Sequence, residues 1–206
     1  MSPLRTAMLI AALLVTAPGS LAPARAQGEA AVHDFVAALD RQLHVIRADT
    51  GEAAIRTACR GLPGRILDVD AMARAAVRDK WGAITPSQRS AYRAAFHDRM
   101  LSVCARLVRD YHGDKITLLG VRSAEGGDRL ATIRLGADEE NGRMVTWRLH
   151  GTGGSLKAID VISDGRSAVS TARNEYSAIL DSNNGNFDAL IDFLRRQGPC
   201  SRPDCS

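Results

Sequence analysis

The chain has 206 residues, of which 45% are hydrophobic and 24% charged, and its formal net charge is +4 at pH 7. This length and apolar content suffice for one domain with its own core. The lysines and arginines are scattered among acids, with no basic run and no interleaved aromatic residues, so the composition does not favour a nucleic-acid partner.

The first residues have the pattern of an export signal. Arg5 supplies the positive start, an apolar core runs from Ala7 to Ala17, and Ala24-Arg25-Ala26 forms a small-x-small cleavage site. A single-pass anchor is the alternative, but an apolar core of about 11 residues is well short of the roughly 20 needed to span a bilayer. We therefore expect cleavage after Ala26. The expected organisation is a signal peptide at 1–26, one domain at 27–197 and a cysteine-containing tail at 198–206.

Helical periodicity dominates the first half of the remaining chain. A stripe of apolar residues predicts an amphipathic helix from Glu29 to Ile46, and a short helix is expected at Glu52 to Cys59. Asp68 or Asp70 can cap a third helix that runs toward Trp81.

The clearest helix start follows. Thr85 is placed as the N-cap, Pro86 as the first helical residue and Gln88 as the partner in a capping box. We expect this helix to reach about Tyr111. Its apolar face consists of residues spaced by three or four, namely Tyr92, Phe96, Met100, Val103, Leu107 and Tyr111.

The period then changes to that of strands, which are expected at 116–121, 130–135, 143–150 and 156–163. In the third, Val145, Trp147 and Leu149 point to one face, which is expected to be buried. The short connections imply antiparallel neighbours. The last strand leads into two amphipathic helices, the second capped by Asn186, which must cover the sheet to bury their apolar faces. The pattern predicts an α+β domain.

Four cysteines allow three pairings, and export permits disulfides. Cys200 and Cys205 flank a short turn-forming sequence and are the pair we favour. Cys59 and Cys104 each lie on a helical apolar face, where buried free thiols are common. A second bridge between them stays open.

No arrangement of residues indicates catalysis or a metal site. The loop that follows His150 is rich in glycine, but it lacks an accompanying nucleophile motif and fits a hairpin turn better. Asp160 falls within an apolar strand, where it can satisfy a helix end or pair with Arg173. We therefore expect neither an enzyme nor a cofactor.

Two stretches carry a resemblance to a known family. The first is Ile159-Asp160-Val161-Ile162-Ser163-Asp164-Gly165-Arg166-Ser167 with the Tyr176 and Leu180 that follow it. The second is Trp81-Gly82-Ala83-Ile84-Thr85-Pro86-Ser87-Gln88-Arg89 with Tyr92, Phe96 and Tyr111-His112-Gly113. Their order and spacing resemble the MlaC-type periplasmic lipid-binding proteins, also called the toluene-tolerance auxiliary component of ABC transporters, which include a branch associated with hopanoids. The resemblance covers about residues 67–197, and the cysteine tail departs from the family pattern.

The resemblance implies a four-stranded antiparallel sheet covered by amphipathic helices that enclose an apolar cavity. Without the resemblance, the residues favour a simpler interpretation, a dry core in which the apolar faces pack on one another and leave no cavity. On the lipid interpretation, the side chains that would contact lipid are Trp81, Tyr92, Phe96, Met100, Val103, Leu107, Val145, Trp147, Leu149, Ile159, Ile162 and Tyr176. Asp160 would then lie near a headgroup.

The resemblance also implies a function and partners. The chain would be a monomeric periplasmic carrier of a phospholipid or hopanoid-like lipid. Its partners would be an inner-membrane ABC transporter complex with MCE domains and an outer-membrane lipoprotein complex. The alternative is a ligand-free interaction or assembly module of a transporter, and a lipid hydrolase is a third interpretation that lacks its nucleophile.

Overall fold

The computed structural model describes residues 24–45, 51–109, 115–136, 142–151 and 155–198. The helices are α1 (Ala24–Val45), α2 (Glu52–Arg65), α3 (Val69–Val77), α4 (Pro86–Arg109), α5 (Ala168–Ser182) and α6 (Phe187–Gln197), with short 3-10 turns at Arg78–Lys80 and Glu125–Gly127. The strands are β1 (Ile116–Ser123), β2 (Arg129–Leu135), β3 (Arg143–His150), β4 (Lys157–Ser163) and β5 (Arg166–Ser167).

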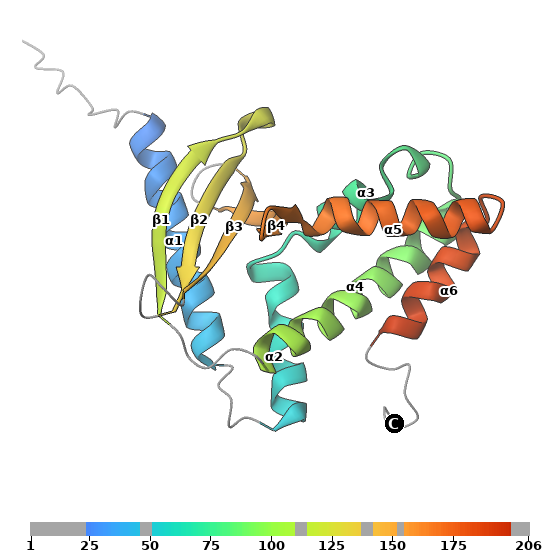
Figure 1. The fold of residues 1–206 in the computed structure, drawn as a ribbon, viewed down its shortest axis with the longest axis horizontal. Helices are drawn as coiled ribbons and strands as arrows, with labels where there is room; N and C mark the ends of the chain where they lie inside the picture. The colour runs from blue at the N-terminus through green and yellow to red at the C-terminus, as the bar shows by residue number, and fades with distance from the viewer. Residues whose placement is uncertain (1–23, 46–50, 110–114, 137–141, 152–154, 199–206) are drawn as a thin grey trace, which may run out of the picture.

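The five strands form one antiparallel sheet in the order β1-β2-β3-β4-β5. The α+β class and the antiparallel sheet are confirmed, and β5 adds a short fifth strand to the four expected. Figure 1 shows α1 running along the sheet, while α5 and α6 lie at the far end of the molecule and α4 runs between the two parts.

Pairing across the strands decides which face each side chain occupies. Val121, Ala131, Trp147 and Val161 lie opposite one another in register, so they form one row on the same face. This face packs against apolar side chains of α1 and α2. The opposite face is more polar, as shown by the hydroxyl contact of 2.9 Å between Thr132 and its neighbour on β3.

Local capping explains where several helices begin. The amide of Thr85 donates to Gln88 Oε1 at 3.1 Å, and the amide of Gln88 donates to Thr85 Oγ1 at 3.2 Å, which confirms the capping box. Of the two candidates for α3, Asp68 is the cap, because its Oδ1 accepts from the amide of Ala71 at 2.9 Å. Asn186 caps α6 as expected.

Two helix boundaries differ from expectation. The short helix at Glu52–Cys59 continues to Arg65, across a non-helical residue at Pro63. Helix α1 begins at Ala24, before the expected Glu29, so the helix continues across the bond at which we expect cleavage. In the part of the chain that the structure describes, no helix is both long and apolar enough to cross a membrane.

The buried side chains form two clusters. The sheet core contains α1, α2 and the sheet face described above. The helix core contains α3, the first half of α4, α5 and α6. Leu67 packs against both. It belongs to a short parallel bridge to β4, where the amide of Asp68 donates to Ala158 O at 2.9 Å and the amide of Ala158 donates to Ile66 O at 2.8 Å.

A disulfide joins Cys59 of α2 to Cys104 of α4. Cys59 is fully buried, so the bridge fixes the second half of α4 against the sheet core. The two residues are therefore paired rather than free thiols. The bridge that we favoured, Cys200 to Cys205, lies outside the described residues.

Candidate functional site

The predicted lipid-contacting residues divide between the two cores. In the helix core, Tyr92, Phe96 and Tyr176 are buried, and Trp81 and Met100 are partly buried against them. In the sheet core the corresponding residues come from one face of β3: Val145 and Leu149 are buried and Trp147 is partly buried. The structure therefore does not bring Phe96 and Trp147 together as facing walls of one cluster.

The aromatic residues of the helix core pack on one another. The ring of Tyr92 lies 5.4 Å from that of Phe187, 5.9 Å from that of Phe96 and 6.4 Å from that of Tyr176, measured between centroids. Trp81 meets the same ring edge-on at 6.3 Å. These are the separations of interlocked aromatic side chains. The dry-core interpretation describes this part of the molecule.

The other four predicted residues come from α4 and β4. Val103 is partly buried on α4, and Leu107 belongs to the same helix with a side chain outside the described part. Ile159 sits at the irregularity where the pairing of β3 with β4 shifts by one residue. Ile162 pairs with Thr146, so its side chain lies on the face of the sheet opposite Trp147.

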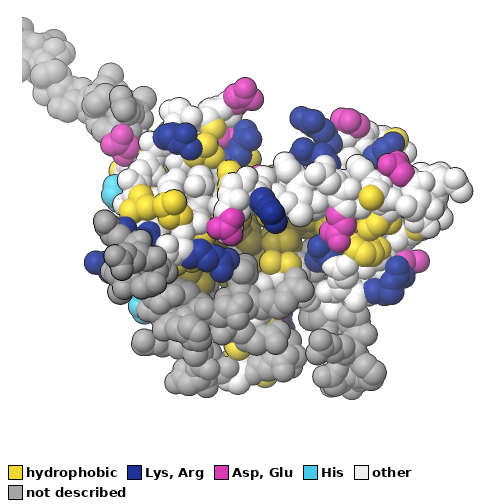
Figure 2. Space-filling view, viewed as in Figure 1, with side chains coloured by type: hydrophobic (Ala, Val, Ile, Leu, Met, Phe, Trp, Pro, Cys, Tyr) yellow, Lys and Arg dark blue, Asp and Glu magenta, His cyan; other side chains and the backbone are white. Residues whose placement is uncertain are grey.

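Five partly buried apolar side chains pack against one core or against both. Leu101 of α4, Trp147 of β3 and Val161 of β4 pack against the sheet core, Met100 packs against the helix core, and Leu67 packs against both. We call these five residues the apolar junction. Figure 2 shows hydrophobic side chains at the bottom of a hollow near the centre of the molecule, between the part that carries the sheet and the part that carries α5 and α6, with charged side chains of both signs around it.

Sequence reasoning missed Leu101 and Val161. Leu101, Cys104 and Ala105 form a second apolar stripe on α4, at spacings of three and four, beside the stripe that begins at Tyr92. This stripe was visible in the sequence. Val161 was also visible, as an apolar residue two positions after Ile159, and the strand pairing places it in the row with Trp147.

Two buried polar atoms, one in each core, have no hydrogen-bond partner among the described residues. They are Nε1 of Trp147 and the hydroxyl oxygen of Tyr176. Burial raises the pKa of Tyr176 to about 12, and the nearby Arg99 opposes this rise. By contrast, the hydroxyl of Tyr92 donates to the backbone oxygen of Ala73 at 2.9 Å.

A charged pair connects α4 to α5 beside the helix core. Arg99 Nη2 donates to Glu175 Oε2 at 2.9 Å, and its guanidinium also lies over the ring of Phe193. The side chain of Arg99 is only 19% exposed. The pair therefore holds the two helices together close to Tyr176.

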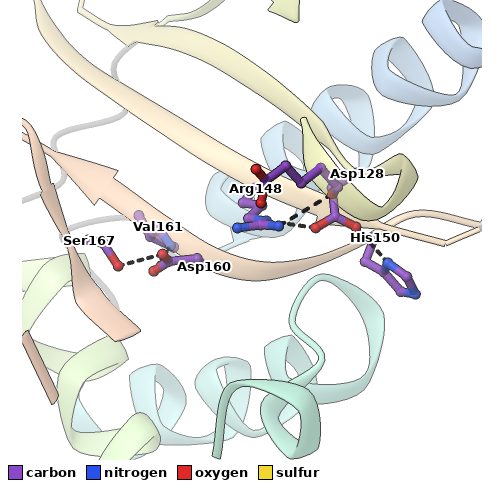
Figure 3. Close-up of polar contacts among 7 residues, drawn as sticks. Asp128, Arg148, His150, Asp160, Val161 and Ser167 are labelled. Carbon is purple, nitrogen blue, oxygen red and sulfur yellow. Dashed lines mark hydrogen bonds and ion pairs between the residues drawn. The ribbon is translucent and has the colours of Figure 1, made fainter. Parts of the chain in front are cut away.

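A second charged group lies at the end of β2 and β3 (Figure 3). Asp128 is buried, and its two carboxylate oxygens accept from Arg148 Nε and contact His150 Nδ1, both at 2.6 Å. Burial alone would raise the pKa of Asp128, but the bonds with His150 and Arg148 outweigh it and hold the pKa below its ordinary value. Arg148 lies on the face opposite Trp147, so the group is separate from the apolar junction.

Asp160 has a structural role, which Figure 3 also shows. Its Oδ1 accepts from the amides of Val161 at 2.8 Å and Val169 at 3.1 Å, and its Oδ2 accepts from the hydroxyl of Ser167. It therefore accepts a hydrogen bond from an amide at the start of α5, as expected. The alternative pairing with Arg173 is wrong, because that guanidinium donates to the backbone oxygen of Ala75.

The site offers apolar surface rather than reactive groups. Within the described ranges, no group of three or more His, Cys, Asp or Glu residues is arranged to hold a metal ion. What the arrangement can do is bury hydrocarbon, because hydrophobic side chains lie at the bottom of the hollow in Figure 2.

Comparisons with known proteins agree with this geometry. A model of the MlaC protein family matches residues 36–196. A solved structure of the phospholipid-binding protein from Ralstonia solanacearum, in complex with a phospholipid, has the same fold, with a TM-score of 0.63 and 18% sequence identity over 85% of this chain and 97% of that chain. The family match spans most of the sequence. The chain therefore belongs to the MlaC family, a family of non-enzymatic periplasmic lipid carriers.

Proposed function

We propose that this chain carries a phospholipid or a related lipid through the periplasm, with the acyl chains held at the apolar junction. The observation that carries the proposal is the hollow in Figure 2, which has hydrophobic side chains at its bottom, together with the five apolar side chains that the two cores leave only partly buried. The Ralstonia solanacearum protein of the same fold supports it, because that protein was solved with a phospholipid.

The proposal assigns different roles to the residues predicted from sequence. Trp147 and Met100 contact the lipid, together with Leu67, Leu101 and Val161. The buried aromatic residues of the helix core have a structural role and do not contact the lipid. Their mutual ring contacts leave them little area to offer a ligand.

The energetics of acyl chains decide how such a carrier works. Burial is worth about 0.8 kcal/mol per methylene, so two chains of about 16 carbons have a gross transfer free energy near 25 kcal/mol. Release into water would then be far too slow for transport. The lipid must pass directly between the carrier and a docked donor or acceptor.

The proposal extends to docking partners and processing. We propose that an inner-membrane ABC transporter complex with MCE domains is one partner and that an outer-membrane lipoprotein complex is another. The mature chain would begin at Gln27 after cleavage following Ala26, and would act as a monomer with a domain at 27–197 and a short cysteine tail at 198–206. Phospholipid and hopanoid-like lipids share the apolar bulk that the site accepts.

Native mass spectrometry of gently purified protein tests the proposal. We expect adducts of lipid mass, and extraction followed by lipid mass spectrometry would identify the cargo. A chain that is purified empty and takes up no lipid from liposomes would contradict the carrier function. That result would favour a ligand-free interaction module instead.

A further inference from the structure

The indole N–H of Trp147 is a buried donor in an apolar wall. Trp147 stands in register with Ala131 and Val161, on the face of the sheet that packs against α1 and α2. Its Nε1 is buried and has no hydrogen-bond acceptor among the described residues. A buried donor without an acceptor costs about 1–3 kcal/mol. A phenylalanine would supply apolar surface at this position without that cost.

The immediate surroundings supply only weak acceptors. The nearest aromatic neighbour is Phe35 of α1, whose ring centroid lies 5.9 Å from that of Trp147 at an interplanar angle of 60°. Val145 and Leu149, which flank Trp147 on the same face of β3, are apolar. An aromatic ring face accepts an N–H only weakly, so this contact does not replace a hydrogen bond to oxygen.

A diacyl lipid carries suitable acceptors. Its two ester carbonyl oxygens stand at the boundary between the hydrocarbon chains and the headgroup. When the chains occupy the apolar junction, a carbonyl oxygen can accept from an indole N–H in the wall. The bond would fix how deeply the lipid enters, because it engages one point along the molecule.

We propose that the indole N–H of Trp147 donates to an ester carbonyl oxygen of the bound lipid and thereby selects acyl esters over lipids that lack the carbonyl. This inference rests on the proposed carrier function and adds to it the chemical group that the protein recognises. Trp147 is in this role a positioning and specificity residue.

A pair of lipids that differ only in this group tests the inference. Dipalmitoyl phosphatidylethanolamine and its dihexadecyl ether analogue have the same headgroup and nearly the same chains. We expect the wild-type protein to bind the ester lipid about fivefold more tightly, the value of one ordinary hydrogen bond of about 1 kcal/mol. Trp147→Phe should bind both lipids equally, whereas Trp81→Phe, which changes the indole of the helix core, should keep the ester preference.

A measurement on the unmodified sequence keeps the test independent of folding defects. The chain has two tryptophans, so a nitrogen-15 correlation spectrum contains two indole resonances, and Trp147→Phe assigns them. The Trp147 resonance should move to higher proton frequency with the ester lipid and stay near its free position with the ether lipid. Equal binding of both lipids by the wild type, or an ester preference that survives Trp147→Phe, would overturn the inference while the carrier function stands. Failure to bind either lipid would instead contradict the carrier function.

Discussion

Two neighbouring tyrosines differ in whether the hydroxyl is hydrogen-bonded, and therefore in what each hydroxyl contributes to stability. The rings of Tyr92 and Tyr176 are in edge-on contact and both are buried, yet only the hydroxyl of Tyr92 has an acceptor among the described residues. The removal of a bonded hydroxyl loses its hydrogen bond to the oxygen of Ala73, while the removal of an unbonded one relieves a desolvation cost.

We therefore expect Tyr92→Phe to lower the free energy of unfolding by about 1 kcal/mol, and Tyr176→Phe to leave it unchanged or raise it slightly. Urea denaturation of both variants measures the difference, and each is the matched control of the other. A loss in Tyr176→Phe as large as that in Tyr92→Phe would mean that this hydroxyl is bonded in solution.

The charge on Asp128 makes stability depend on pH. Its pKa is lower in the folded chain than in the unfolded chain, where an aspartate titrates at about 3.9. The stabilisation from His150 and Arg148 is therefore fully present above that value and is lost as pH falls through the folded pKa.

Asp128→Asn should accordingly be less stable than wild type at pH 7, and the difference should shrink as pH falls below about 4. The urea midpoints of wild type and Asp128→Asn, measured at several pH values from 7 to below about 4, test this expectation. Asp192→Asn is the control, because its pair with Arg195 is exposed and should matter little at pH 7. A difference between wild type and Asp128→Asn that persists at low pH would mean that packing rather than charge is responsible.

At the scale of elements, the Cys59 to Cys104 bridge holds α2 against α4. The two residues are 45 positions apart, and the chain-entropy account gives about 4 kcal/mol for closure of a loop of that length. We expect Cys59→Ala with Cys104→Ala to lose a stability of this order in denaturation experiments. A double variant as stable as the wild type would show that packing alone holds the two helices.

Elements also show which features could be read from the sequence. The capping box of Thr85 and Gln88, the cap at Asn186 and the alternation along β3 depend on residues close in the chain, and all were predicted correctly. The pairing of Cys59 with Cys104 was left open, because spacing alone cannot choose among three pairings.

The division of α4 between two cores was not predictable from periodicity. The helix presents Tyr92 and Phe96 to α3, α5 and α6, and Leu101 to the sheet core. An apolar stripe indicates that a face is buried, but the partner that covers it depends on tertiary structure. The sequence therefore indicated an apolar face on the long helix without showing that its two halves have different neighbours.

At the scale of the whole molecule, the two cores and the junction between them should respond differently to mutation. Leu101→Asn places a polar amide at the apolar junction, where the side chain is partly buried, so we expect lipid retention to fall much more than the melting temperature. Phe96→Ala removes a ring from the helix core and should cost about 3–5 kcal/mol of stability. Lipid mass spectrometry and thermal unfolding of both variants separate the two effects. Parallel losses in Leu101→Asn would place Leu101 in the core.

The short bridge between Leu67 and Ala158 has a mechanical consequence. It ties the sheet to the start of α3 through two backbone hydrogen bonds, and β4 continues beyond it to the cap of α5. Helix α4 joins the two cores at a second place, because its first half belongs to the helix core and its second half is bonded to α2 by the disulfide. Because both β4 and α4 span the two cores, tilting one half against the other would strain a strand and a cross-linked helix together, so we expect a bulkier cargo to be accommodated by rearranged side chains instead.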